Sequence, residues 1–296
     1  MEQDAHVPHS DALPAPAVLG LERGAARLAD LLGGGGVVVL SGAGVSTASG
    51  IPDYRGETGR SRTAPPMQWD DFAGSAEARR RYWARGQVGY RRYADVRPNA
   101  AHHAVAALGR AGLVDAVVTQ NVDGLHQAAG SDPVVELHGT LAEVVCMDCA
   151  RREPRPALQD RQLERTPWIA EVGARAQADG DAVVDEDVVA RFEPVACVGC
   201  GGPLRPDVVF FGEFVPRERI LAARAAVEGA RVVLVVGSSL TVGSGYLLVR
   251  RAVRGEVPVG VVNLGPTRAD HLVDVRVDAD VCHVLPRVVE LLARLR

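Results

Sequence analysis

The sequence predicts an α/β protein built on a doubly wound, parallel, Rossmann-like sheet. Short, wholly apolar stretches rich in valine recur along the chain, for example at Val37–Leu40 and Val232–Val236. Such runs are typical of strands that are buried on both faces of a parallel sheet. Stretches with helical spacing alternate with them, which is the pattern of βαβ connections. Small or polar residues follow several runs directly, where open α/β sheets bind their ligands.

Length and composition favour a globular protein with one large and one smaller folding unit. The chain has 296 residues, of which 47% are apolar and 24% are charged. Its net charge of −4 provides no basic field for nucleic acid or a membrane surface. No apolar run reaches the roughly 18 residues that span a bilayer, and the N-terminal stretch lacks the features of a secretory signal. We therefore expect a disordered tail over residues 1–17, a cytoplasmic protein, and no nucleic-acid or membrane partner.

The first expected helix covers residues 17–32 and ends at the glycines of 33–36. Residues 57–97 are expected to form a loop and helical insertion near the ligand, with a helix over 76–93. Pro98 has the position of a helix start. The remaining expected elements are strands at 115–119, 134–137, 204–211, 232–236 and 257–262, and helices at 217–229, 245–254 and 284–295.

A glycine-rich turn follows the first strand, in the stretch VVVLSGAGVSTASGIPDYRG. Gly42 and Gly44 permit a sharp turn and close approach to a ligand, and a helix opening after them would direct N–H groups at a phosphate. Thr47 stands where a dinucleotide fingerprint has its third glycine, so the turn alone also fits a connection without a ligand. The next loop, Ser49–Arg55, adds a proline, a carboxylate, an aromatic ring and a guanidinium, which a dehydrogenase does not need.

Four cysteines form two pairs, Cys146-x-x-Cys149 and Cys197-x-x-Cys200. Four thiolates make the closed tetrahedral set of a structural zinc site, which leaves no position open for substrate. Two redox dithiols are the alternative interpretation. Residues 150–196 separate the pairs, more than the usual spacing of about 15–20 residues, so this segment must leave and return. We expect a small zinc-binding domain over 141–203, inserted into a larger domain made of 18–140 and 204–296.

Seven motifs in order resemble the Sir2 family, the sirtuins, which are NAD-dependent protein deacylases. GAGVSTASGIPDYRG is followed by TQNVDGLH, ELHG, the two cysteine pairs, LRPDVVFFGE, VVGSSL and VNLG. The motifs extend roughly from Leu31 to Pro286. Stretches at 80–85 and 177–181, and the string PTRAD, resemble the class II branch. The resemblance implies NAD as a co-substrate, one structural zinc ion, a NAD-binding larger domain, and an acyl-lysine protein or peptide as partner.

The resemblance also assigns roles to individual residues. His138 would be the general base, since a histidine titrates near neutrality, and Asn121 and Asp123 would share the catalytic site. The residues expected to bind NAD are Gly42, Ala43, Gly44, Thr47, Asp53, Tyr54, Arg55, Gln120, Asn121, Asp123, Gly237, Ser238, Ser239, Asn263, Leu264, Gly265 and Cys282. The residues expected to line the acyl-lysine channel, where a substrate strand would pair with the protein, are Val208, Val209, Phe210, Phe211, Gly212 and Glu213.

The implied reaction consumes NAD. The acyl oxygen of a modified lysine attacks C1′ and expels nicotinamide, His138 then helps the 2′-hydroxyl attack, and water releases lysine and O-acyl-ADP-ribose. In the succinyl- and malonyl-selective branch, a tyrosine and an arginine bind the acyl carboxylate. Counting back from Pro98 without gaps places Gly86 and Gly89 at those positions. We therefore expect no anionic clamp, and room for a longer or branched acyl chain.

Three other functions fit parts of the pattern. A protein mono-ADP-ribosyltransferase shares the first chemical step. An NAD(P)-dependent oxidoreductase carrying a zinc ribbon would cycle its cofactor and change the absorbance of the reduced nicotinamide. A non-catalytic zinc-ribbon binding protein would keep its function when His138 is replaced by alanine.

Overall fold

A seven-stranded parallel sheet forms the larger lobe of the computed structural model, which describes residues 16–54, 66–173, 175–176 and 181–294. The strand order is β1-β12-β11-β10-β2-β3-β4, and every neighbouring pair is parallel. The doubly wound sheet predicted from the sequence is therefore confirmed. Its strands are β1 (Val18–Leu19), β2 (Val37–Ser41), β3 (Val114–Thr119), β4 (Val134–Glu136), β10 (Val232–Val236), β11 (Val259–Val262) and β12 (Val275–Val277).

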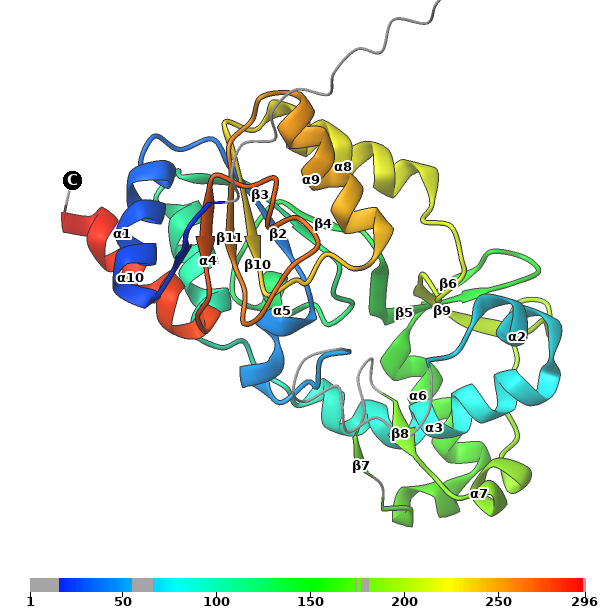
Figure 1. Cartoon of the computed structure of the whole chain (residues 1–296). Coiled ribbons are helices and arrows are strands. Elements are labelled where there is room, and N and C mark those ends of the chain that lie inside the picture. The colour runs from blue at the N-terminus through cyan, green and yellow to red at the C-terminus, as the bar shows by residue number, and fades with distance from the viewer. Residues whose placement is uncertain (1–15, 55–65, 174, 177–180, 295–296) are drawn as a thin grey trace, which may run out of the picture.

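Helices cover both faces of this sheet (Figure 1). On β2, Val37 and Val39 belong to one buried cluster and Val38 and Leu40 to the other, because side chains alternate along a strand. Both faces are dry, which is why these strands read as continuous apolar runs. One face is covered by α1 (Leu21–Leu32), α4 (Ala100–Arg110) and α10 (Val281–Arg294), and the other by α8 (Arg217–Gly229) and α9 (Gly243–Arg254).

The strand order reverses between β2 and β10. From β2 the chain continues outward to β3 and β4, whereas β10 begins the opposite half with β11 and β12. Parallel sheets bind ligands at such a switch point, outside the carboxyl ends of the strands. The two turns there touch directly: the Gly42 N–H donates to the Val236 carbonyl at 3.1 Å and the Gly44 N–H to the Gly237 carbonyl at 2.8 Å.

The expectation of a helix directly after the glycine turn is wrong. Two short 3-10 turns, Ala43–Val45 and Thr47–Ser49, take its place. The Asn99 side chain donates to the Val45 carbonyl at 2.8 Å, so this carbonyl already has a partner outside the segment. Gly50 then ends the second turn in the left-handed region at φ 92°. Serine and threonine in this stretch also favour local turns over helix.

A smaller lobe contains a three-stranded antiparallel sheet of order β6-β5-β9. Its buried cluster joins Trp83 and Val88 of α3 to Cys146 and Cys197, so this helix and the cysteine module share one core. Figure 1 shows the lobe beside the carboxyl edge of the large sheet. Its elements are β5 (Gly139–Cys146), β6 (Arg152–Pro154), β7 (Arg175–Ala176), β8 (Ala182–Val183), β9 (Leu204–Val208), α2 (Trp69–Gly74), α3 (Ala76–Ala94), α6 (Arg155–Arg165) and α7 (Glu186–Arg191).

Other differences from the predicted elements are local. The run at 204–211 is a strand only to Val208, and it pairs antiparallel with β5 instead of joining the parallel sheet. Residues 1–15 of the expected tail and 57–65 of the expected insertion lie outside the described residues. Within the described part of the chain, every helix is too short or too polar to cross a bilayer.

Gly139 connects the two lobes, and replacing it tests how closely β5 packs against β9. It has φ +82°, and a Cβ there would lie 2.0 Å from the Asp207 carbonyl oxygen on β9. We expect Gly139→Ala to reduce the free energy of unfolding by about 3 kcal/mol or more, from strain and overlap together. Urea unfolding measures this. Gly229→Ala is the control, since nothing lies within 4 Å of its added Cβ. Equal stability of the two variants would contradict the arrangement.

Candidate active site

A cavity of about 840 Å³ opens at the carboxyl ends of β2 and β10 and takes residues from both lobes. Most residues expected to bind NAD or substrate line it. These are Gly42, Ala43, Gly44, Asp53, Tyr54, Gln120, Asn121, Asp123, His138, Val208, Val209, Phe210, Phe211, Gly212, Glu213, Gly237, Ser238, Ser239, Asn263, Leu264 and Gly265.

Two of the residues expected to bind NAD do not line the cavity, and a third is not described. The Thr47 hydroxyl donates to the Gly44 carbonyl at 3.1 Å, so it supports the turn from behind. The Cys282 thiol lies 3.4 Å from Asn99 Oδ1 at the start of α10. Neither is among the cavity-lining residues, and Arg55 is outside the described residues.

His138 lies where β4 leads into β5, and both ring nitrogens have partners. Nδ1 is 2.9 Å from the Gln120 carbonyl oxygen, and Nε2 is 2.8 Å from the Ser244 hydroxyl. A carbonyl only accepts, so Nδ1 carries the hydrogen and Nε2 holds the lone pair. Burial lowers the pKa of His138 and the Arg219 charge adds to this, against the hydrogen bond to Gln120. The ring is therefore neutral near pH 7, with its basic nitrogen at the cavity.

Asn121 and Asp123 are joined by Ser46. The Ser46 hydroxyl donates to Asp123 Oδ2 at 2.7 Å and lies 3.1 Å from Asn121 Nδ2. Asn121 also donates to the Gly42 carbonyl at 3.2 Å. The second Asp123 oxygen accepts the Leu125 N–H at 3.0 Å. This network fixes both side chains against the glycine turn, and burial raises the pKa of Asp123.

Loops after β10 and β11 complete the far side of the cavity. Gln120 Nε2 donates to the Ser238 hydroxyl at 2.9 Å, which ties the end of β3 to the end of β10. The side-chain amide of Asn263 donates to two carbonyls of its own loop, those of Leu264 at 2.8 Å and Gly265 at 3.0 Å. The buried Arg276 donates to the Asn263 carbonyl at 3.1 Å and supports the loop from below.

The expected acyl-lysine channel is held by an ion pair and an aromatic cluster. Arg205 makes two bonds of 2.7 Å to the Glu213 carboxylate, which also accepts the Phe210 N–H at 2.9 Å. Glu213 therefore holds the loop in shape. The Phe210 ring packs on Phe72 and Tyr82, with centroids 4.6 and 5.5 Å away.

At Gly86, one of the two positions expected to leave room for a longer acyl chain, a neighbouring side chain fills the space, whereas the expectation for Gly89 stays a prediction. A Cβ there would lie 3.2 Å from Nη2 of Arg155. The guanidinium of Arg155 is buried, donates to the Gly86 carbonyl at 3.0 Å, and lies 4.8 and 4.7 Å from the ring centroids of Trp83 and Tyr90. An arginine from α6 thus occupies the space that the missing side chain leaves.

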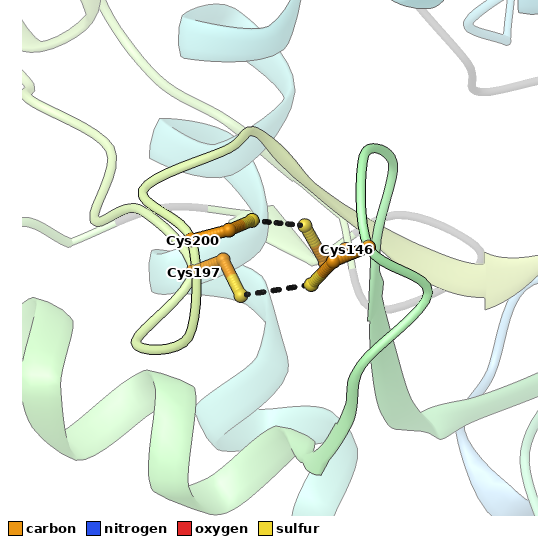
Figure 2. Close-up of side chains that lie close together, drawn as sticks. Cys146, Cys197 and Cys200 are labelled. Carbon is orange, nitrogen blue, oxygen red and sulfur yellow. Dashed lines mark hydrogen bonds between the residues drawn. The ribbon is translucent and has the colours of Figure 1, made fainter.

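The four cysteines of the two pairs converge, as Figure 2 shows for Cys146, Cys197 and Cys200. All four sulfurs lie within 4.8 Å of one another. The Cys146–Cys200 and Cys149–Cys197 separations are 3.4 and 3.8 Å. Tetrahedral Zn–S bonds of about 2.3 Å imply sulfurs about 3.7 Å apart, whereas a disulfide needs about 2.05 Å. The donor set fits one structural zinc ion.

Sequence reasoning missed several residues that the cavity uses. Ser46 lies two residues after Gly44, and a hydroxyl so close to the glycine turn was an available signal for a residue of the site. Arg85 and Asp181 form a 2.6 Å ion pair at the cavity wall. Ser244 contacts His138 across a sequence separation of 106. Arg85 and Asp181 lie in the stretches 80–85 and 177–181 that resemble the class II branch, which was an available signal. No local pattern marks Ser244, because only tertiary packing brings it to His138.

The Rossmann-like lobe, with its cavity at the switch point of the sheet, is typical of nucleotide-binding proteins, and the four cysteines of the smaller lobe could hold one metal ion. The Sir2 family profile matches residues 42–244. NAD-dependent protein deacetylase 1 of Streptomyces coelicolor is 53% identical over 252 residues, covering 85% of this chain and 84% of the relative. NAD-dependent protein deacetylase of Bordetella bronchiseptica is 51% identical over 251 residues, covering 85% and 92%. The chain belongs to the Sir2 family.

Solved structures agree with this assignment. A complex described as "Sir2-p53 peptide-NAD+" has a TM-score of 0.69 and 30% identity, covering 91% of this chain and 98% of its own. "Structure of Sir2Tm bound to a propionylated peptide" has a TM-score of 0.70 and 31% identity, covering 90% and 97%.

Loss of one thiolate should release the metal. We expect Cys200→Ser to lower the bound zinc from one ion per chain and to loosen the smaller lobe, because folding and metal binding are coupled. Elemental analysis and amide hydrogen exchange over β5 and β9 measure both effects. Cys282→Ser is the control, since this cysteine is remote from the cluster. Full zinc content in the Cys200 variant would argue against four-thiolate binding.

Proposed function

We propose that this chain is an NAD-dependent protein lysine deacylase in which His138 is the general base. The observation that carries the proposal is the imidazole at the cavity, with Nδ1 bound to the Gln120 carbonyl and Nε2 left as the basic nitrogen. Relatives covering most of this chain are NAD-dependent protein deacetylases, and a related structure is "Sir2 bound to acetylated peptide". NAD and acyl-lysine are consumed, and lysine, nicotinamide and O-acyl-ADP-ribose are released.

The remaining roles follow from position in the cavity. The Gly42–Gly44 turn would hold the pyrophosphate, because its backbone lies open at the switch point. Asn121 and Asp123 would orient the nicotinamide ribose, and the loops around Ser238 and Asn263 would hold the adenosine half. Segment 208–213 would line the acyl-lysine channel. The four-thiolate zinc would stabilise the smaller lobe and leave the chemistry to the cavity.

The oxidoreductase and the non-catalytic zinc-ribbon protein receive no support from the family assignment. Three finer statements belong to the proposal. The NAD-binding domain comprises residues 18–140 and 204–296, with an insertion at 57–97, and the zinc-binding domain covers 141–203; helix α3 of the insertion and strand β9 pack in the smaller lobe. The chain represents the class II branch, on the motif resemblance given above. It acts in the cytoplasm, which its relation to NAD-dependent enzymes of bacteria favours.

Mass spectrometry of the protein with NAD and a panel of acyl-lysine peptides tests the activity. We expect free lysine peptide, with equimolar nicotinamide and O-acyl-ADP-ribose, and a loss of deacylation of about 10²-fold or more in His138→Ala. The exposed His283→Ala is the control. Nicotinamide release with ADP-ribosylated protein and no lysine peptide would instead identify a mono-ADP-ribosyltransferase.

The pH dependence of kcat/KM tests the state of His138. A general base must be neutral, so activity falls as pH drops through its pKa. Burial and Arg219 hold this pKa below the usual histidine value of 6.5, so the acidic limb should lie below about pH 6.5. Arg219→Gln should move the limb upward, because the imidazolium no longer faces that cation. A limb above pH 6.5, or one that Arg219→Gln leaves in place, would contradict this assignment.

A further inference from the structure

We propose that Ser244 is a positioning residue for the reaction. Its hydroxyl donates a hydrogen bond to His138 Nε2 in the resting enzyme and accepts a hydrogen bond from Nε2–H once the base is protonated. The proposal rests on the proposed role of His138. Its direct observation is the 2.8 Å contact between Ser244 Oγ and His138 Nε2. Both residues line the same cavity.

The hydroxyl suits both protonation states of the base. In the neutral ring, Nδ1–H is committed to the Gln120 carbonyl, so Nε2 must accept and Ser244 must donate. To take the proton of the ribose 2′-hydroxyl, Nε2 first releases the Ser244 hydrogen bond, because it has one lone pair. As that proton moves to Nε2, the ribose oxygen bonds to the acyl carbon of the imidate, the C=N π electrons move to the lysine nitrogen, and the imidazolium acquires a second N–H. Rotation of the Ser244 hydroxyl then presents an oxygen lone pair to that N–H. Without it, a partly buried charged donor would depend on water.

The start of α9 places Ser244 against the base. Ser244 is the second residue of this helix, after the N-cap Val242 and Gly243. Gly245 allows the close packing, because a Cβ there would lie 2.7 Å from Gln120 Oε1. Gln120 in turn accepts from His138 through its carbonyl. The first turn of α9, the end of β3 and the imidazole therefore form one packed unit, in which the serine has a fixed place.

The positive charges around His138 disfavour the imidazolium, so the ring benefits from a neutral partner that can both donate and accept a hydrogen bond. Arg219 on α8 disfavours the imidazolium, and the N-terminal end of α9 carries a partial positive charge with the same effect. Arg219 is itself paired with Asp207 at 2.7 Å, so this carboxylate is engaged with the arginine. A hydroxyl that accepts from Nε2–H supplies local compensation without adding a fixed charge to the cavity.

The test separates the two chemical steps, since nicotinamide leaves before His138 acts. In single-turnover reactions with NAD and an acetyl-lysine peptide, we expect Ser244→Ala to slow formation of lysine peptide about tenfold, the effect of one charge-assisted hydrogen bond. Nicotinamide release should change less than about twofold, and KM for NAD should not change. Ser244→Thr keeps the hydroxyl and should recover most of the rate. Tyr246→Phe, which removes a hydroxyl elsewhere on α9, is the matched control.

Two further measurements test the role of Ser244 without relying on the overall activity. The ¹⁵N resonance of His138 Nε2 should shift in Ser244→Ala while Nδ1 stays, which reports the contact without turnover. In a His138→Ala background, Ser244→Ala should cause no additional slowing, because the serine acts through the ring. An unshifted Nε2, or equal loss of both steps with a raised KM, would overturn the role of Ser244. Full deacylation by His138→Ala would overturn the proposed function instead.

Discussion

The turns after β2 and β10 meet through backbone atoms, and the site depends on that contact. A Cβ at Gly44 would lie 2.8 Å from the Gly237 carbonyl oxygen, and one at Gly237 would lie 2.3 Å from the Val45 nitrogen. Side chains at these positions would force the strand ends apart. The glycines therefore bring two halves of a parallel sheet close enough for one ligand to touch both, as a switch point requires. Asn121, Ser46 and Gln120 then add side-chain bonds to turns that the backbone has already positioned.

A second constraint links the position of His138 to the segment proposed to line the acyl-lysine channel. The His138 carbonyl accepts the Val209 N–H at 2.8 Å, and Gly139 lies so close to Asp207 that only hydrogen fits in place of a side chain. The residue that carries the base is thus hydrogen-bonded to the segment proposed to line the acyl-lysine channel. A shift of that segment would move the base with it, so the distance between base and substrate is set by the main chain. Main-chain bonds of this kind hold geometry with less freedom than long side chains do.

The sequence predicts best what depends on neighbours along the chain. Its patterns give the bounds of β10 and α8 as the structure has them, because an apolar run and a helix start are local signals. They do not reveal β1 and β12, which have two and three residues. They also do not show that β9 pairs antiparallel, since a strand's apolar pattern does not name its partner. The contacts of Ser244 with His138 and of Arg155 with Gly86 join distant segments, and only packing decides them.

The metal module influences the cavity although a closed thiolate site has no position for substrate. Cys146 and Cys197 belong to the buried cluster that contains Trp83 of α3. Tyr82, the preceding residue, packs against Phe210 with ring centroids 5.5 Å apart, and both line the cavity. Fixing the four sulfurs therefore fixes the helix, and the helix fixes the aromatic wall that an acyl chain would meet. Because packed interiors transmit strain instead of absorbing it, the positions of the four sulfurs influence the shape of the aromatic wall in the proposed acyl-lysine channel.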